Sequence, residues 1–159
     1  ASLGNLENYA SLAGFCFIMG ESIISWKSFK EPVIALSTVE AEYIALTPAV
    51  QECIFLQNFL QSMGYQTTKT EIREDNNACI ALAKNPQDKK RTRHIQIRFH
   101  WIREQLENGI FTLIPTKTLN QLADIFTKGM HGPQLKTISA KLGLVQDSVK
   151  QGESEIVNR

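Results

Sequence analysis

The segment at residues 37–46, which reads Ser-Thr-Val-Glu-Ala-Glu-Tyr-Ile-Ala-Leu, constrains the fold of this chain more than any other. Ser37 and Glu40 stand three residues apart, as in a capping box, and this pairing predicts the start of a helix. Apolar residues then recur at helical spacing, so we predict one long helix over residues 38–63. Pro48 lies within it and predicts a kink, because a proline inside a helix removes one backbone hydrogen bond.

The other segments predict strands alternating with helices. A second capping box, Thr118 with Gln121, marks the start of the helix that carries Asp124. Asp75 follows the carboxyl end of a predicted strand, which is where open α/β sheets bind ligands. The predicted elements are a hairpin at 14–28, a strand at 70–74, a short helix at 77–83, an amphipathic helix at 95–106, a strand at 110–114, a short helix at 118–126 and a last helix at 134–142.

The length of 159 residues and the apolar content of 43% suit one globular domain. The three cysteines, Cys16, Cys53 and Cys79, have no paired spacing, which favours buried free thiols in a reducing compartment. No apolar run reaches the ~18 residues of a membrane span and no leader opens the chain, so we expect an intracellular, soluble protein. We assign residues 1–145 to a single domain and residues 146–159 to a disordered tail.

Scattered acidic residues indicate a metal site, although each also has an ordinary explanation. Glu40 serves the capping box, which leaves Glu42 near the core without a local role. Asp75 could simply favour a helix N-terminus, and Asp124 could be an exposed helical residue. Buried carboxylates that lie side by side are unfavourable unless a cation neutralises them. Glu42, Asp75 and Asp124 therefore form a divalent-metal site if the fold brings them together.

A basic segment occupies residues 84–103, where seven Lys and Arg residues accompany a single acid, Asp88. Phe99 and Trp101 lie beside it, a combination that suits a polyanion such as nucleic acid, with a solvated charged face as an equal alternative. The sequence contains no His-x-x-x-His pair, no glycine-rich phosphate loop and no Gly-x-Ser-x-Gly elbow. Nucleotide triphosphate hydrolysis and serine hydrolysis therefore receive no support.

Three further segments complete a pattern with residues 37–46. They read Glu-Asp-Asn-Asn-Ala-Cys-Ile-Ala-Leu-Ala, Arg-His-Ile-Gln-Ile-Arg-Phe-His-Trp-Ile-Arg-Glu and Asn-Gln-Leu-Ala-Asp-Ile-Phe-Thr-Lys. In this order and spacing the segments resemble the ribonuclease H domain that ends a copia-type LTR retrotransposon polyprotein, over essentially residues 1–145. The resemblance implies an α/β protein with the ribonuclease H-like fold, in which a mixed sheet carries helices on both faces.

The implied enzyme is an endoribonuclease that cuts the RNA strand of RNA–DNA hybrids during reverse transcription, with two Mg²⁺ ions, or Mn²⁺, as cofactors. Glu42, Asp75 and Asp124 match the family's catalytic metal ligands. The basic residues that would bind nucleic acid are Lys89, Lys90, Arg91, Arg93, His94 and Arg98. The implied partners are the hybrid and the reverse transcriptase domain of the same polyprotein, with no membrane, and the implied location is a cytoplasmic virus-like particle or the nucleus.

The resemblance also implies one strand and one acid that this chain lacks. Family members begin with a central strand that ends in a catalytic aspartate, and residues 1–5 resemble the loop that follows that strand. We therefore expect the aspartate directly upstream of Ala1, and we expect the fragment alone to expose unpaired strand edges and to be unstable and inactive. A domesticated or decayed module that binds nucleic acid or a partner, and a tether that positions hybrid for the polymerase, remain as alternatives.

Overall fold

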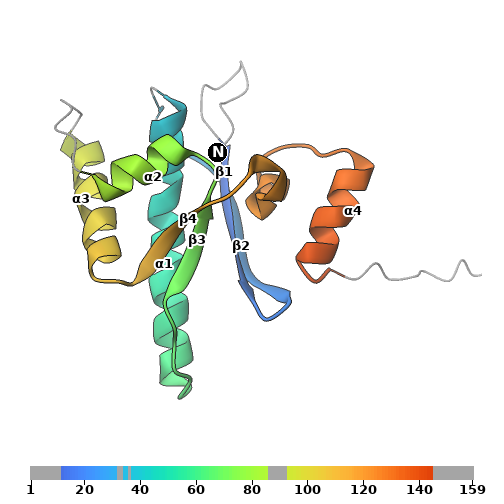
Figure 1. The fold of residues 1–159 in the computed structure, drawn as a ribbon, viewed down its shortest axis with the longest axis horizontal. Coiled ribbons are helices and arrows are strands. Elements are labelled where there is room, and N and C mark those ends of the chain that lie inside the picture. Colours follow the sequence, from blue (N-terminus) through green and yellow to red (C-terminus); the bar gives the residue numbers. More distant parts are fainter. Residues whose placement is uncertain (1–11, 32–33, 36, 86–92, 145–159) are drawn as a thin grey trace, which may run out of the picture.

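The computed structural model describes residues 12–31, 34–35, 37–85 and 93–144, with residues 93–95 described by their backbone only. In chain order the elements are β1 (Leu12–Met19), β2 (Ser22–Lys30), α1 (Thr38–Ser62), β3 (Thr70–Glu74), α2 (Asn77–Lys84), α3 (Arg93–Glu107), β4 (Phe111–Pro115), the 3₁₀ helices η1 (Thr118–Asn120) and η2 (Leu122–Phe126), and α4 (Gly132–Lys141). Figure 1 shows this mixed arrangement of helices and strands, which confirms the α/β content of the predicted fold.

β1 and β2 form the predicted antiparallel hairpin. Gly20 occupies its turn with a φ of 65°, a left-handed conformation that glycine adopts without steric cost. The strand register shifts at an irregularity between Phe17 and Ile18. The backbone N–H of Ile23 donates to the carbonyl oxygen of Leu142 at 3.1 Å, so the hairpin is also tied to the end of α4.

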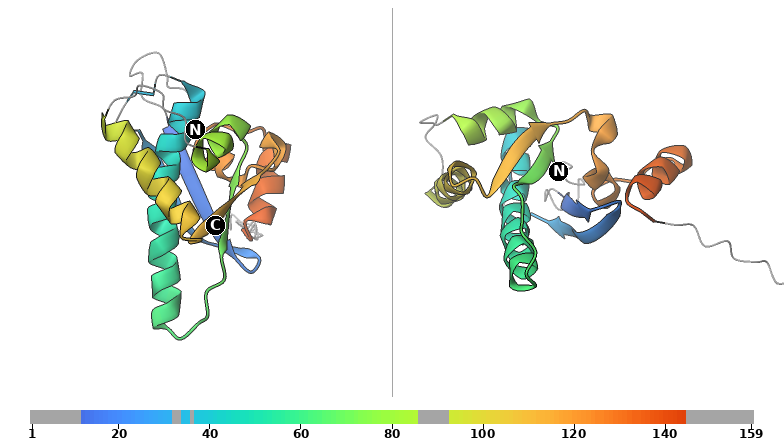
Figure 2. Two further views of the ribbon diagram at one scale, coloured as in Figure 1. Left: turned by 60° about the vertical axis from the view of Figure 1, so that its left-hand side comes forward. Right: turned by 60° about the horizontal axis from the view of Figure 1, so that its bottom comes forward.

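β3 and β4 form a second sheet, in which the strands run parallel and Ile72 lies opposite Leu113. Within the described residues β1 is hydrogen-bonded to β2 and β3 to β4, and no ladder joins the two pairs. The strands are therefore divided between two small sheets, and Figure 2 shows the hairpin standing apart from β3 and β4.

α1 begins where the capping box predicts. Ser37 is in an extended conformation, and its hydroxyl oxygen accepts a hydrogen bond from the backbone N–H of Glu40 at 3.2 Å. This cap satisfies one of the backbone donors that a helix start leaves unpaired. α1 contains Pro48 and ends at Ser62, and Figure 1 shows it as one long helix.

The main core forms where α1 meets α2, α3 and the β3–β4 sheet. The rings of Tyr43 and Phe99 stack with centroids 3.8 Å apart, and the Tyr43 hydroxyl donates to the carbonyl oxygen of Phe99 at 3.3 Å. Ile102 and Phe111 are fully buried in the same cluster. These long-range contacts fix the position of α1 relative to the end of β3.

The segment that carries Asp124 is not the single helix predicted from the sequence. Residues 118–126 form η1 and η2 instead, and neither begins with a side-chain cap. The predicted capping box is therefore wrong, since the side chain of Gln121 donates to the carbonyl oxygen of Arg73 at 3.3 Å. η2 contacts β1 and α4, so tertiary contacts set its conformation.

The end of the described chain is α4, which begins at Gly132 rather than at residue 134 as predicted. Pro133 lies in its first turn, where a proline costs no helical hydrogen bond. The predicted tail at 146–159 lies outside the described residues. Among the residues that the structure does describe, no helix is both long enough and apolar enough to cross a bilayer.

Candidate metal centre

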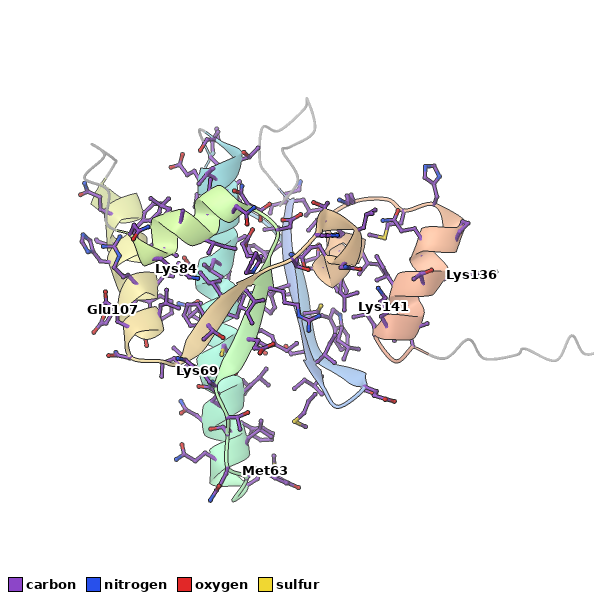
Figure 3. All side chains as sticks on the ribbon, in the orientation of Figure 1. Met63, Lys69, Lys84, Glu107, Lys136 and Lys141 are labelled. Carbon is purple, nitrogen blue, oxygen red and sulfur yellow. The ribbon has the colours of Figure 1, made fainter. Side chains whose placement is uncertain are left out.

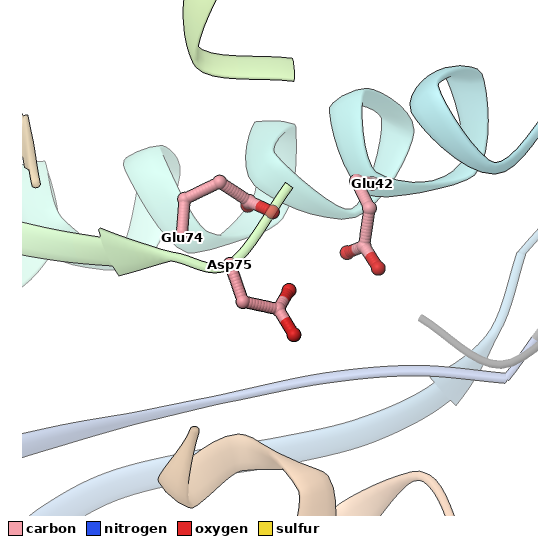
Figure 4. A group of neighbouring side chains, drawn as sticks. All are labelled: Glu42, Glu74 and Asp75. Carbon is pink, nitrogen blue, oxygen red and sulfur yellow. The ribbon is translucent and has the colours of Figure 1, made fainter. Parts of the chain in front are cut away.

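Three carboxylates converge at one end of β3. Glu42 comes from the second turn of α1, Glu74 is the last residue of β3, and Asp75 follows it directly. One oxygen from each lies within 4.8 Å of the others, and Figure 4 shows the three side chains around one space. The structure thus brings together Glu42 and Asp75, two of the three acids singled out from the sequence, and adds Glu74.

Local structure explains why Asp75 stands at this point. The side-chain oxygen of Asn76 accepts hydrogen bonds from the backbone N–H groups of Ala78 and Cys79, at 3.0 and 3.1 Å, and so caps α2. The chain therefore turns sharply between β3 and α2. On the β3 side, the N–H of Thr116 donates to the Glu74 carbonyl oxygen at 2.9 Å, which anchors the strand end to the residue after β4.

Burial and mutual repulsion make this cluster electrostatically costly. Glu74 is 6% exposed, and burial, with the nearby charge of Glu42, raises the pKa of its carboxyl to about 7. One of its oxygens accepts a hydrogen bond from the N–H of Asn76 at 3.0 Å. Burial also raises the pKa of Glu42, and the charges of Asp75 and Asp124 add to that rise. A bound cation would relieve this repulsion.

Asp124 lines the same cleft from η2 but is not in the group of three acids whose oxygens lie within 4.8 Å. It is close enough for its charge to raise the pKa of Glu42. Its Oδ2 atom lies 2.6 Å from the Nζ atom of Lys128, four residues later in the chain. The three acids singled out from the sequence therefore line one cleft, and Asp124 reaches it from η2.

A close contact between η2 and the hairpin places Asp124 there. A Cβ atom on Gly14 of β1 would lie 2.9 Å from the Cβ of Phe126 and 3.1 Å from the Cγ2 of Thr127, so only glycine permits this approach. The hydroxyl of Ser28 on β2 donates to the carbonyl oxygen of Phe126 at 2.7 Å. The hairpin thereby holds the turn that presents Asp124.

The cleft between the two sheets has a volume of about 1360 Å³. One face of α1 forms part of its lining, together with β1 on one side and β3 on the other. In the described residues, neither the β1 edge nor the β3 edge that borders the cleft has a strand partner. The acids lie toward one end of α1, while Met63 marks the far end of that helix in Figure 3.

Glu74 is the site residue that the sequence interpretation missed. Residues of a strand alternate between its two faces, so Glu74 shares a face with Ile72 and Thr70 rather than with its exposed neighbours. The position of a glutamate on the inward face of a strand, next to Asp75, could have identified Glu74 as a member of the site. A further buried acid, Glu31, lies outside this group: it is 4% exposed, neither of its oxygens has a hydrogen-bond partner among the described residues, and burial raises its pKa to about 7.

The structure bears on only one residue of the predicted nucleic-acid-binding set. Lys89, Lys90 and Arg91 lie outside the described residues. Arg93 and His94 begin α3, but their side chains lie outside the description as well, which leaves Arg98, a half-buried residue of α3. In Figure 3 Lys84 projects at the end of α2, close to α3. The interface with nucleic acid therefore stays a prediction.

Comparison with known proteins places the chain among retrotransposon sequences. No family model and no solved structure matches it. It is 38% identical to a retrovirus-related Pol polyprotein from transposon TNT 1-94 of Nicotiana tabacum, over 79% of this chain and 9% of that protein. It is 29% identical to the Pol polyprotein from transposon RE1 of Arabidopsis thaliana, over 90% of this chain and 10% of that protein.

The similarity extends to yeast. A transposon Ty1-NL2 Gag-Pol polyprotein of Saccharomyces cerevisiae is 25% identical over 89% of this chain and 8% of that protein. The chain thus spans about a tenth of the length of the curated relatives it matches.

Proposed function

This chain is homologous to copia-type retrotransposon Pol polyproteins over most of its length, and from that premise we propose that it is the ribonuclease H portion of such a polyprotein. The proposed reaction is cleavage of the RNA strand of RNA–DNA hybrids formed during reverse transcription. One observation carries the proposal: acids from α1, β3 and η2, far apart in the sequence, face a single cleft.

The donor set fits a hard divalent cation. All the groups are carboxylates, which suit Mg²⁺ or Mn²⁺ rather than a softer metal. Burial and repulsion raise the pKa values of Glu42 and Glu74, so a cation stabilises their ionised forms. Glu42, Asp75 and Asp124 are the proposed ligands. Two bound ions would activate a water molecule and stabilise the leaving oxygen of an in-line displacement.

We assign Glu74 a supporting role in this centre. Its carboxyl accepts a hydrogen bond from the N–H of Asn76, lies beside Glu42 and Asp75, and would contribute negative charge to the centre once a bound cation favours its ionised form. Basic residues from 89 to 98 would bind the phosphate backbone of the hybrid, and contacts to 2′-hydroxyl groups would distinguish RNA from DNA.

We further propose that the cleft between β1 and β3 holds one additional strand in the active enzyme. Support comes from two strand edges that have no partner within the described part of the chain, and from the cleft that β1, β3 and α1 line together. Strand edges present unpaired N–H and C=O groups that one extended segment could satisfy on both sides. The result would be a single mixed sheet, as the ribonuclease H-like fold requires.

The test is an assay on a labelled hybrid with two versions of the protein, the 159-residue chain and a version extended by the coding sequence immediately upstream. We expect Mg²⁺-dependent cleavage of the RNA strand by the extended version, loss of cleavage with a chelator, and no cleavage of the DNA strand. A duplex of DNA alone is the substrate control. If the extended, folded protein leaves the hybrid intact with both Mg²⁺ and Mn²⁺, the proposed activity is wrong.

A further inference from the structure

Lys128 makes a short ion pair with one of the proposed metal ligands. Its Nζ atom lies 2.6 Å from Oδ2 of Asp124, and the side chain of Asp124 is only 14% exposed. The two residues are also joined through the backbone, since the N–H of Lys128 donates to the carbonyl oxygen of Asp124 at 3.1 Å. The same carbonyl oxygen accepts the hydroxyl of Thr127 at 3.3 Å. The turn after η2 therefore brings the ammonium group directly onto the carboxylate.

A second lysine on the cleft is engaged differently. Lys141 of α4 also lines the cleft, but its Nζ atom donates to the side-chain amide oxygen of Asn120 at 3.4 Å, a neutral partner. Figure 3 shows Lys141 on the same helix as Lys136. Lys128 and Lys141 carry the same charge, but the partner of Lys128 is a proposed metal ligand and the partner of Lys141 is not.

The side chain of Lys128 is well placed to leave Asp124. It is 44% exposed, so its ammonium group can move into solvent without breaking the packing of η2. A lysine also carries its charge on a flexible stem with a strongly hydrated head. Asp124 cannot move in the same way, because Phe126 and Thr127 are packed against Gly14 of β1.

We propose that Lys128 is a positioning residue that neutralises and holds Asp124 when no divalent ion is bound, and that competes with a divalent ion for Oδ2. The inference rests on the proposed metal centre. An ammonium group and a divalent cation repel each other at the distance of one shared carboxylate, so the ion displaces the lysine. Lys128 thus lowers the affinity of the centre for metal while it stabilises the metal-free cleft.

Two linked effects distinguish this role from that of an ordinary surface lysine. Removal of the ammonium group leaves Asp124 facing Glu42 and Asp75 without its counter-charge. A divalent ion should then bind more tightly, by about two- to fivefold, which corresponds to an ion pair near the surface. The metal-free protein should melt about 1–4 °C lower, since the repulsion among the acids is less well screened.

The experiment measures Mn²⁺ binding by titration calorimetry, and metal-free melting, for the upstream-extended protein and its variants. Lys128→Met should bind Mn²⁺ about two- to fivefold more tightly and melt lower without metal. Lys128→Arg, which keeps the charge, should behave like the parent. Lys141→Met is the matched control: it removes one positive charge from the same cleft, so its Mn²⁺ affinity should change less than that of Lys128→Met.

Equal or weaker Mn²⁺ binding by Lys128→Met would overturn the inference, as would an equal gain in Lys141→Met, which would reflect net charge alone. If Lys128→Met folds poorly, Lys128→Gln replaces it in the same comparison. Saturable Mn²⁺ binding without a lysine effect leaves the metal centre standing and removes the role of Lys128. If the parent protein shows no saturable Mn²⁺ binding at all, both the proposed centre and this inference are wrong.

Discussion

Glu42, Glu74 and Asp75 stand on elements that enter the main core, whereas Asp124 stands on η2, which rests on the hairpin. On the first wall, α1 and the β3–β4 sheet share a buried cluster with α2 and α3. On the second wall, the position of the acid depends on Gly14, Ser28 and the turn after η2. The same cleft thus has one wall fixed by a buried core and one wall fixed by a few contacts between η2 and the hairpin.

Substitutions on the two walls should therefore differ in whether they lower hybrid cleavage or the free energy of unfolding. A substitution in the core loosens the first wall only by weakening the whole unit, because the buried side chains there contact several elements. A substitution at the hairpin–η2 contact can move Asp124 while the main core stays intact.

The largest effect is expected from Glu42→Gln. It removes a charged ligand from the proposed centre without changing side-chain volume, so cleavage of the hybrid should fall by ~10³-fold or more. Glu40→Gln, two residues earlier on α1, should retain most activity because glutamine also completes a capping box. Steady-state cleavage rates of both variants are measured in the upstream-extended protein. Comparable losses in the two would contradict the assignment of Glu42 as ligand and Glu40 as cap.

Ile102→Ala should weaken the whole structure rather than the site. The side chain is fully buried on α3, and its loss should lower the free energy of unfolding by ~2–5 kcal/mol. Ile97→Ala on the same helix is the control, because that side chain is 62% exposed and its loss should matter little. Denaturant titration measures both. An equally small effect at the two positions would mean that the first wall is not anchored by this core.

The pH dependence of stability should report on Glu74. Its pKa is about 7 in the folded chain and lower when unfolded, so the folded state binds more protons between those values. Metal-free stability should therefore fall as pH rises from about 4.5 to about 7, by at most ~1.4 kcal/mol per pH unit for this one proton. Glu74→Gln should flatten part of that slope in melting experiments, and an unchanged slope would show that the carboxyl is not buried as described.

Gly14→Ala tests the second wall. The added Cβ would lie 2.9 Å from the Cβ of Phe126, so η2 must shift and carry Asp124 away from the cleft. Overpacking of this kind costs ~1–3 kcal/mol, and a displaced ligand should lower cleavage by ~10-fold or more. Gly129→Ala adds the same methyl group where no atom of the described residues lies within 4 Å. It should leave the stability and the cleavage rate unchanged. Equal losses of stability and cleavage in the two variants would mean that the contact between Gly14 and η2 is not the cause.

The two walls also differ in how far they could be predicted from the sequence. The start of α1 and the position of Asp75 follow from local rules, because Ser37 and Asn76 cap helices with their own side chains. Glu42 could therefore be selected by elimination once Glu40 had a capping role. The hairpin was predictable for the same reason, since Gly20 marks its turn.

The conformation of the second wall could not be predicted from local rules. The spacing of Thr118 and Gln121 suggests a capping box, but Gln121 bonds to the end of β3, a contact between residues 48 positions apart. Glu74 was missed because its role depends on which face of β3 turns inward and on the distance to α1. The fit of Gly14 against Phe126 is equally non-local, since β1 and η2 are joined only in the folded chain.

Ser28→Ala should give the smallest effect and the sharpest test of how η2 is held. The Ser28 hydroxyl donates to the carbonyl oxygen of Phe126 at 2.7 Å, from an exposed position, so its loss should cost ~0.5–1.5 kcal/mol at most. Water can replace an exposed donor, which limits the change in cleavage to a few-fold. In combination with Gly14→Ala the losses should not add, because both act on the same turn. Strict additivity in cleavage and unfolding measurements would mean that glycine and serine hold η2 independently, and that the second wall is stiffer than its contacts indicate.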